Sequence, residues 1–317
     1  MNDQPLVSIV TPSLNQSKFI QATIESILSQ DYPNLEYWVI DGGSNDGTIE
    51  ILKSYGERIH WLSEPDDGQS QAVNKGWRLA KGNILGWVNA DDLLKPFAVR
   101  NAVEALLATP SIGAVYGRTN YIDEQGKFIQ NYPVQSFNYE AFVRDTENFI
   151  PQPSVFTHRN VLERTGFLNE KLHYVMDYDL WLRIGLTASM KYLPVEMAAL
   201  RLHSAAKTVS AMSKFAGEFI SIYEDLFSNS AILSTLQQDQ NTIMQTVYIH
   251  SASFCFWGGE TQTALSYLLK AWQLPPFPRR RAFWLLFAFS IFGKTGWKLA
   301  EYLHGNPMQL KKGVITR

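Results

Sequence analysis

Residues 5–12 (PLVSIVTP) and 35–43 (LEYWVIDGG) decide the fold that we expect for this chain. In each stretch a run of apolar, β-branched or aromatic residues ends in turn formers, proline in the first and Asp-Gly-Gly in the second. Short runs that end in this way are typical of buried strands. Between them, apolar residues recur at helical spacing over residues 19–28. The chain therefore begins as strand, helix, strand.

The same alternation continues as far as residue 88. We expect a helix around residues 49–52, a strand at 59–62, a helix over 69–80 and a strand over 84–88. Strands and helices in this order form right-handed parallel crossovers, so the predicted fold class is α/β with a doubly wound sheet. Ligands of such sheets bind beyond the carboxyl ends of the strands. Residues that follow strand ends are therefore the first candidates for a site.

The pattern then becomes mixed. Residues 112–118 are expected to form a strand, 176–186 an amphipathic helix, and 191–202 a strand pair or an extended run. We therefore predict an α/β domain over residues 1–212 and a helical region over 213–317.

The helical region contains one recognisable hairpin. Residues 248–275 are typical of a helix, a Gly258-Gly259 turn, a second helix and a stopping proline. This pattern resembles a single tetratricopeptide-like hairpin. Because stable stacks need about three repeats, we interpret it as a two-helix cap.

Composition narrows the class of protein. The 317 residues carry 28 Lys and Arg against 30 Asp and Glu, and the net charge of −2 argues against nucleic acid as a partner. A hydrophobic share of 45% and a charged share of 18% are values of globular proteins. The single cysteine, Cys255, excludes a disulfide framework and agrees with a reducing, cytoplasmic location. Nothing in this composition points to an oligomeric state.

Two segments bear on membranes. Met1–Pro5 lack the basic and apolar regions of a signal peptide, so none is expected. Residues 282–292 (AFWLLFAFSIF) are apolar except for Ser290, but a spanning helix needs about 20 apolar residues. With basic residues on both sides, the segment 279–298 is expected to be either a buried helix or one that contacts a membrane surface peripherally.

Asp41 opens the glycine-rich turn DGGSNDGT at residues 41–48, between a strand and a helix. Backbone N–H groups in such a turn can point toward an anion, and the carboxylate can accept a hydrogen bond from a base or ribose. The same residue types are also ordinary turn formers, so the turn alone leaves both interpretations open.

Residues 89–92 (Asn-Ala-Asp-Asp) follow the last strand of the alternation. Two carboxylates and an amide oxygen suit a hard divalent cation. The alternative is that Asp92 caps the helix entered near Pro96.

Asp177 begins the helix over 176–186. Asp177 and Asp179 are two residues apart and point to nearly opposite sides of it, so they cannot share one task. Asp177 lies one turn before Trp181, so a carboxylate and an apolar wall can face the same cleft, where the carboxylate can act as a general base. Alternatively, these acids complement the helix dipole.

Taken in order, these motifs, together with Gly68 and Asn74-Lys75-Gly76, resemble the family 2 glycosyltransferases over residues 5–205. The resemblance implies the GT-A fold, a Rossmann-like fold of nucleotide-diphospho-sugar transferases. Its mixed, mostly parallel sheet is flanked by helices, here with a C-terminal helical extension. The resemblance also implies a nucleoside-diphosphate sugar donor, Mg²⁺ or Mn²⁺ as cofactor, and inversion of the anomeric centre.

The resemblance further assigns roles to individual residues. Those implied to lie beside the nucleotide sugar are Thr11, Pro12, Asp41, Gly43, Asn74, Gly76, Asn89 and Ala90. Asp177 takes the position of the catalytic base, and Asp91 that of the principal metal ligand. Two departures stand out: Asn89 replaces the first Asp of the family's D-x-D, and Met176 replaces a frequent Glu.

Three further residues complete the expected site. His203 follows the last strand-like run, and in similar enzymes a histidine near this place can reach the metal or the diphosphate. Gln152, by its position and polarity, and Trp181 are expected on the acceptor side. The acceptor is expected to be a glycan or a lipid-linked glycan, in polysaccharide or glycolipid assembly.

Two other functions stay open beside the inverting transferase. A protein that binds sugar nucleotides or serves as a scaffold without turnover is compatible with Asn89 in the metal site. A nucleotidyltransferase is expected to have a basic, glycine-rich loop after its first strand, whereas residues 11–15 (TPSLN) contain neither glycine nor charge. The released product distinguishes the three: nucleoside diphosphate, nothing, or pyrophosphate.

Overall fold

The computed structural model describes residues 4–203, 212–278 and 281–304. They divide into two compact units. The first, called the sheet unit, comprises the residues up to Phe137 and Asn148–Arg201. The second, called the helical unit, comprises Asn138–Glu147 and the residues from Leu202 on.

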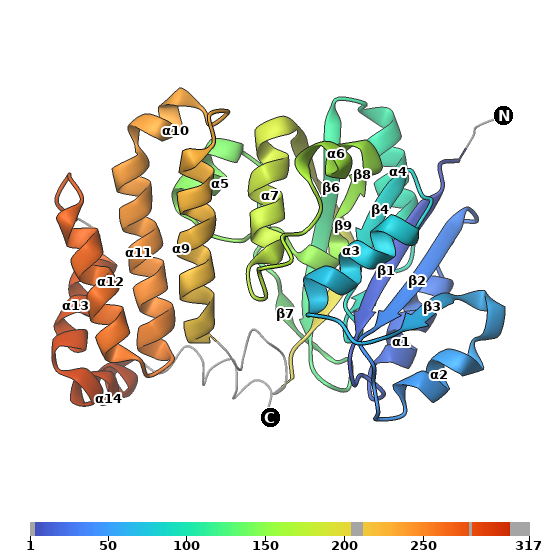
Figure 1. The fold of residues 1–317 in the computed structure, drawn as a ribbon, viewed down its shortest axis with the longest axis horizontal. Coiled ribbons are helices and arrows are strands. Elements are labelled where there is room, and N and C mark those ends of the chain that lie inside the picture. Colours follow the sequence, from blue (N-terminus) through green and yellow to red (C-terminus); the bar gives the residue numbers. More distant parts are fainter. Residues whose placement is uncertain (1–3, 204–211, 279–280, 305–317) are drawn as a thin grey trace. The chain divides into compact units, whose positions relative to one another are not determined.

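A mixed β-sheet is the centre of the sheet unit (Figure 1). Its strands are β1 (Val7–Ser13), β2 (Leu35–Asp41), β3 (His60–Ser63), β4 (Ile84–Trp87), β5 (Leu93–Leu94), β6 (Ile112–Ile122), β7 (Phe128–Asn131), β8 (Phe156–His158) and β9 (Ser189–Arg201). They follow the order β3-β2-β1-β4-β8-β6-β9-β5, with β7 paired to β6. The first four strands pair in parallel, as the alternating pattern predicted. β9 is one strand parallel to β6, not the strand pair that the sequence allowed.

Helices cover both faces of this sheet. α1 (Ile20–Leu28), α2 (Thr48–Ser54) and α4 (Ala98–Ala108) share one hydrophobic cluster with Ile9 of β1. α3 (Gln69–Leu79) packs on the opposite face, against Val10. Successive strand residues point to opposite faces, so Ile9 and Val10 serve the two layers in turn.

The described part of the sheet unit also contains two further α-helices and two short 3-10 turns. These are α6 (Arg159–Thr165), α7 (Met176–Thr187), Gly56–Arg58 and Gln152–Ser154.

Parallel pairing brings the carboxyl ends of the first four strands to one edge of the sheet. Ser13 pairs with Asp41, and Asp41 pairs with Ser63. Trp87, the last residue of β4, pairs with Val10 of β1. The segments that follow these strands therefore gather at one edge, where a doubly wound sheet binds its ligands.

The helical unit is built from helices packed in antiparallel pairs (Figure 1). They are α5 (Tyr139–Asp145), α9 (Met212–Ser228), α10 (Ser234–Gln238), α11 (Gln240–Trp257), α12 (Thr261–Gln273), α13 (Arg281–Ile291) and α14 (Gly293–His304). The Gly258-Gly259 turn joins α11 to α12, as the sequence predicted. Among the described residues, none of the helices combines the length and apolarity needed to cross a bilayer.

The division into units differs from the predicted boundary at residue 212. The helical unit begins at Leu202 and also takes in residues 138–147. The reason is local packing: the Tyr223 hydroxyl donates a hydrogen bond to the Val143 carbonyl at 3.0 Å. The Thr146 hydroxyl and His250 Nδ1 are hydrogen-bonded at 2.7 Å. α5 thus belongs with helices that lie far from it in the sequence.

Gly76 lets α3 approach the sheet closely, which gives a stability prediction. A Cβ at this position would lie 2.4 Å from Val10 Cγ1 and 3.1 Å from Ile40 Cγ1. Gly76→Ala is therefore expected to lower the free energy of unfolding by about 1–3 kcal/mol, the usual cost of overpacking. Urea unfolding followed by far-UV circular dichroism measures this.

The matched control is Gly217→Ala in α9, where no described atom lies within 4 Å of the added Cβ. Since glycine within a helix costs about 0.5–1 kcal/mol relative to alanine, this variant is expected to be more stable than the parent. Equal stability of Gly76→Ala and the parent would contradict the packing described above.

Candidate functional site

Asp41 ends β2, and its carboxylate is buried within its own turn. Oδ2 accepts hydrogen bonds from the backbone N–H groups of Gly43 (3.0 Å) and Ser44 (2.8 Å) and from the Ser63 hydroxyl (2.8 Å). Oδ1 accepts from the Ser44 hydroxyl. Gly43 has φ +89°, a left-handed conformation that glycine adopts without strain. Asp41 therefore shapes the turn, and its expected hydrogen bond to a nucleobase stays a prediction.

Asp66 supplies a second carboxylate at this turn, which the sequence reasoning missed. Its Oδ1 accepts from the backbone N–H of Gly68 at 2.9 Å, and its Oδ2 lies 2.8 Å from where a Cβ on Gly42 would be. Burial raises the pKa of Asp66, and the charge of Asp41 adds to the effect. Asp66 could have been found by the rule that selected Asp41, because it follows a predicted strand.

Asn89 begins the loop that follows β4, and its amide is fully engaged. Oδ1 accepts from Gln69 Nε2 at 2.7 Å and from Trp87 Nε1 at 2.8 Å. Nδ2 donates to Asp92 Oδ2 at 3.1 Å. Asn89 therefore connects its loop to the first turn of α3. Because its side-chain oxygen already accepts two hydrogen bonds, it is not suited to bind a metal.

Arg201, the last residue of β9, bonds differently to Asp91 and to Asp92. Its backbone N–H donates to Asp92 Oδ1 at 2.9 Å, and its Nε donates to the Asp91 carbonyl at 2.8 Å. Asp92 is 2% exposed, and its burial next to Asp91 raises its pKa well above the usual range. α4 begins at Ala98 after Phe97, so the alternative that Asp92 caps this helix is wrong.

Asp91 is the residue of this loop that fits a divalent cation. Its side chain is half-exposed, unlike that of Asp92. Mg²⁺ is commonly held by one or two carboxylates together with substrate phosphates and water. No group of three His, Cys, Asp or Glu side chains suited to a metal occurs among the described residues. His203 is buried and belongs to the helical unit.

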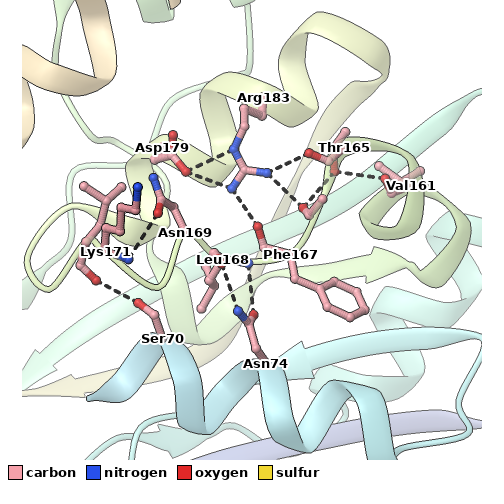
Figure 2. Close-up of polar contacts among 12 residues, drawn as sticks. Ser70, Asn74, Val161, Thr165, Phe167, Leu168, Asn169, Lys171, Asp179 and Arg183 are labelled. Carbon is pink, nitrogen blue, oxygen red and sulfur yellow. Dashed lines mark hydrogen bonds and ion pairs between the residues drawn. The ribbon is translucent and has the colours of Figure 1, made fainter. Parts of the chain in front are cut away.

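Asn74 braces the loop that leads to α7 (Figure 2). Its Nδ2 donates to the Leu168 carbonyl and to Glu170 Oε1, both at 2.9 Å, and its Oδ1 accepts from the Leu168 N–H at 3.0 Å. One turn earlier, the Ser70 hydroxyl donates to the Leu172 carbonyl at 2.8 Å. Asn74 thus supports this loop, and its expected place beside the nucleotide stays a prediction.

Asp179 has a structural task (Figure 2). Its Oδ2 accepts from Arg183 Nε at 3.0 Å and from Nη2 at 2.8 Å. The remaining guanidinium N–H groups donate to the carbonyls of Thr165, Gly166 and Phe167 at 2.8–2.9 Å. Asp179 and Arg183 therefore fix the end of α6, while Asp177 lies elsewhere on α7, as helical spacing predicts.

Asp177 lies in the first turn of α7, where Asn148 holds it. Asn148 Nδ2 donates to Asp177 Oδ2 at 3.0 Å, and the Tyr132 hydroxyl donates to the Asn148 carbonyl at 2.7 Å. Burial raises the pKa of Asp177, and the hydrogen bonds from the Tyr178 N–H and Asn148 oppose this only in part. A carboxylate with a raised pKa can accept a proton as a general base. Nothing in the local sequence marked Asn148, which lies 29 residues away.

Gln152 and Trp181 line one small cavity of about 10 Å³, room for a single water molecule. Gln152 Nε2 donates to the Trp87 carbonyl at 2.6 Å. Gln152 Oε1 and Trp181 Nε1 are buried without a hydrogen-bond partner among the described residues, and a bridging water would satisfy both. This cavity is too small to hold a sugar, and the expectation that Gln152 and Trp181 lie on the acceptor side stays a prediction.

The other residues that the resemblance placed beside the nucleotide sugar lie beneath the strand ends. The Thr11 hydroxyl accepts a hydrogen bond from the Tyr37 hydroxyl at 3.0 Å. Pro12 and Ala90 are buried, and Gly76 sits against Val10. Their side chains therefore face the interior of the sheet unit.

The first turn of α3 links the three acidic segments. Asp66, just before it, lies over the turn of Asp41. Gln69 bonds to Asn89, two residues before Asp91. Ser70 bonds to the loop that enters α7, five residues before Asp177. Hydrogen bonds and close contacts of this turn therefore connect three segments that are distant in the sequence.

A profile of glycosyl transferase family 2 matches residues 8–166, half of the chain. The matched region includes the turn of Asp41 and the loop of Asp91, and it ends before Asp177. The chain therefore belongs to glycosyl transferase family 2 and is, by family, a glycosyltransferase.

Similar proteins include two polysaccharide synthases. A hyaluronan synthase of Pasteurella multocida is 32% identical over 199 residues, 61% of this chain and 20% of that protein. A chondroitin synthase of Pasteurella multocida strain Pm70 is 32% identical over 195 residues, 60% of this chain and 20% of that protein. The match thus spans about a fifth of these synthases. A glycosyltransferase of Rickettsia prowazekii is 28% identical over 231 residues, 71% of each chain.

Two crystal structures share the fold. Staphylococcus aureus TarS 1-349 in complex with UDP-GlcNAc has a TM-score of 0.69 at 16% identity, covering 95% of this chain and 92% of that one. The mannosyltransferase PcManGT of Pyrobaculum calidifontis, with GDP-Man and Mn²⁺, has a TM-score of 0.62 at 19% identity, covering 99% and 86%. The chain has the GT-A fold that the sequence resemblance implied.

The contact between Asn148 and Asp177 gives a prediction that needs no substrate. Asn148→Ala removes a hydrogen bond that favours the ionised carboxylate, so the pKa of Asp177 is expected to rise further. Carbon-13 NMR titration of aspartate carboxyls measures it, with the Asp177 signal assigned by its loss in Asp177→Asn.

Asn34→Ala is the control, since the side chain of Asn34 donates to a backbone carbonyl, that of Gln4, and not to a carboxylate. An Asp177 pKa that is the same in Asn148→Ala and in the parent would show that Asn148 does not act on the carboxylate.

Proposed function

We propose that the chain transfers a sugar from a nucleoside-diphosphate sugar to an acceptor hydroxyl, with inversion at the anomeric carbon. The observation that carries this proposal is the environment of Asp177. Its carboxylate has a raised pKa and accepts a hydrogen bond from Asn148. The first turn of α3 bonds both to the loop that leads to Asp177 and to the loop that carries Asp91. A binding protein has no use for such a base.

In the proposed reaction, Asp177 takes the proton of the acceptor hydroxyl as its oxygen attacks the anomeric carbon. Attack comes from the face opposite the diphosphate, whose bond to the anomeric carbon breaks with both electrons going to the phosphate oxygen. Burial suits this role because it brings the pKa of Asp177 closer to neutral pH. A positioned general base contributes about 10²–10⁴-fold to the rate.

Asp91 is the proposed ligand of Mg²⁺ or Mn²⁺. When bound, such a cation would stabilise the charge on the departing diphosphate as a Lewis acid. Support comes from the half-exposed carboxylate of Asp91 and from the PcManGT structure, which holds Mn²⁺. Arg201 and Asp92 would keep the loop in place without touching the metal.

The donor is proposed to lie along the edge formed by the turn of Asp41 and the loop of Asp91. Asp66 supplies a half-buried carboxylate there, and Gly43 an exposed stretch of backbone. Asn74 and Asn89 would act by positioning these segments, because their amides are engaged. The similar structures with UDP-GlcNAc and GDP-Man support a nucleoside-diphosphate sugar as donor.

The acceptor is proposed to be a glycan or a lipid-linked glycan in polysaccharide or glycolipid assembly. The matches to a hyaluronan and a chondroitin synthase support this class. A cytoplasmic location, with peripheral contact to the membrane through residues 279–298, belongs to the same proposal. The apolar segment with basic flanks supports the contact.

Binding of the donor is tested by thermal shift with UDP-glucose, UDP-GlcNAc and GDP-mannose, each with and without Mn²⁺. A ligand that binds only the folded chain raises its stability by RT ln(1 + [L]/Kd). We expect one donor to raise the melting temperature more with Mn²⁺ than without it, and Asp91→Asn to lose that difference. Asp31→Asn, on the surface near Arg100, is the control. A Mn²⁺ effect that survives in Asp91→Asn would rule out Asp91 as the ligand.

Turnover is tested by release of nucleoside diphosphate from that donor with the full chain. Asp177→Asn is expected to keep the donor-induced thermal shift and to lose at least a hundredfold in rate, because only the base is removed. In the parent, the rate should fall as the pH drops through the raised pKa of Asp177, since protonation removes the base. Binding without release would favour the non-catalytic alternative, and release of pyrophosphate would favour the nucleotidyltransferase.

A further inference from the structure

The last three helices of the helical unit carry an unusual concentration of exposed apolar side chains. Of the 17 exposed large hydrophobic residues in the described part of the chain, ten lie between residues 269 and 303. α12, α13 and α14 pack against one another (Figure 1). The exposed side chains that carry the argument, here called the apolar face, are Trp272, Phe277, Trp284, Leu285, Ile291 and Phe292.

α13 has its apolar stripe on the outside. Trp284, Leu285 and Ile291 of α13, with Phe292 directly after it, are 38–69% exposed. Ile291 follows Trp284 by seven residues and Phe292 follows Leu285 by seven, about two helical turns in each case. The buried positions include Ser290, a polar residue. The inner side is apolar as well, since Phe283 is fully buried in the core of the helical unit. A helix on the surface of a water-soluble domain normally has polar residues on its outer side. An apolar partner for this stripe is therefore expected.

The face is continuous from α12 to α13. The ring centroids of Trp272 and Phe277 lie 5.0 Å apart, those of Trp272 and Trp284 5.4 Å, and those of Phe277 and Trp284 5.5 Å. These three rings form one aromatic cluster that remains substantially exposed. Contiguous patches of this kind mark interaction surfaces, whereas single exposed apolar residues do not.

The helices that carry the apolar face are rich in basic residues. Between residues 269 and 303 the described basic residues are Lys270, Arg281, Lys294 and Lys298, and Glu301 is the one acidic residue of that described stretch. Lys294 and Lys298 are exposed on α14. Basic side chains beside tryptophan and phenylalanine suit the headgroup region of an anionic bilayer, where long stems can lie along the apolar boundary.

We propose that the apolar face docks onto the surface of an anionic membrane, with Trp284 and Phe292 entering the boundary between headgroups and acyl chains. A second copy of the chain fits less well. A twofold contact through this face would bring the basic residues of both copies together. The 11 residues of α13 are too short to span a bilayer, so the contact lies in the plane of the membrane. This proposal deepens the membrane contact included in the proposed function and rests on it, but its test needs neither Asp177 nor sugar transfer.

Sedimentation with sucrose-loaded vesicles tests this proposal on the full chain without any donor. Vesicles of phosphatidylcholine alone are compared with vesicles that contain phosphatidylglycerol. We expect binding to the anionic vesicles at least tenfold tighter than to the neutral ones, and weaker at high salt. Trp284→Ser with Phe292→Ser is expected to weaken binding to the anionic vesicles at least tenfold. Lys294→Gln with Lys298→Gln is expected to weaken it and to reduce its salt dependence.

Leu107→Ser with Phe128→Ser is the matched control, since both residues are 56% exposed and lie in the sheet unit. It is expected to bind like the parent, and far-UV circular dichroism checks that all variants are folded. Absence of parent binding to anionic vesicles would overturn the proposal. So would binding that survives in Trp284→Ser with Phe292→Ser, or a dimer in sedimentation equilibrium that only this variant disrupts.

Discussion

The buried guanidinium of Arg201 joins parts of the sheet unit that are far apart in the sequence, and the candidate site depends on it. Besides the Asp91 carbonyl, it donates to the carbonyls of Asp123 at 2.9 Å and Glu124 at 3.0 Å. It also lies 5.0 Å from the centre of the Phe19 ring. A buried cation is tolerated only when its N–H groups find acceptors, and two loops supply them here. The loop that carries Asp91 is thereby held in one conformation.

The order of strands and helices could be predicted because each strand of the first half ends in a turn former. Val7–Ser13 and Leu35–Asp41 are buried strands, and both end at the predicted edge. The same rule found Asp41 and Asp91 and would have found Asp66. These are local patterns, so one sequence contains enough information to recognise them.

The partners of the polar side chains could not be predicted, because they come from distant segments. Asn74 is engaged by Leu168, 94 residues away, and Gln152 by Trp87, 65 residues away. The family resemblance placed Asn74 beside the donor, and position and polarity placed Gln152 on the acceptor side, but neither indicated these hydrogen bonds. Asn148 was missed for the same reason: its contact with Asp177 exists only once the chain is folded. Burial, too, depends on the folded structure. The raised pKa of Asp177 therefore could not be predicted from the sequence.

The central claim is that the segments of Asp41, Asp91 and Asp177 surround a single donor. The most direct measurement is a crystal structure of the chain with Mn²⁺ and the nucleoside diphosphate of its donor, using the anomalous signal of manganese. The account predicts a manganese peak in contact with the Asp91 carboxylate and the diphosphate. It also predicts the base at the turn of Asp41, and Asp177 facing the side from which an acceptor arrives. Nucleotide and metal bound away from that edge would contradict it.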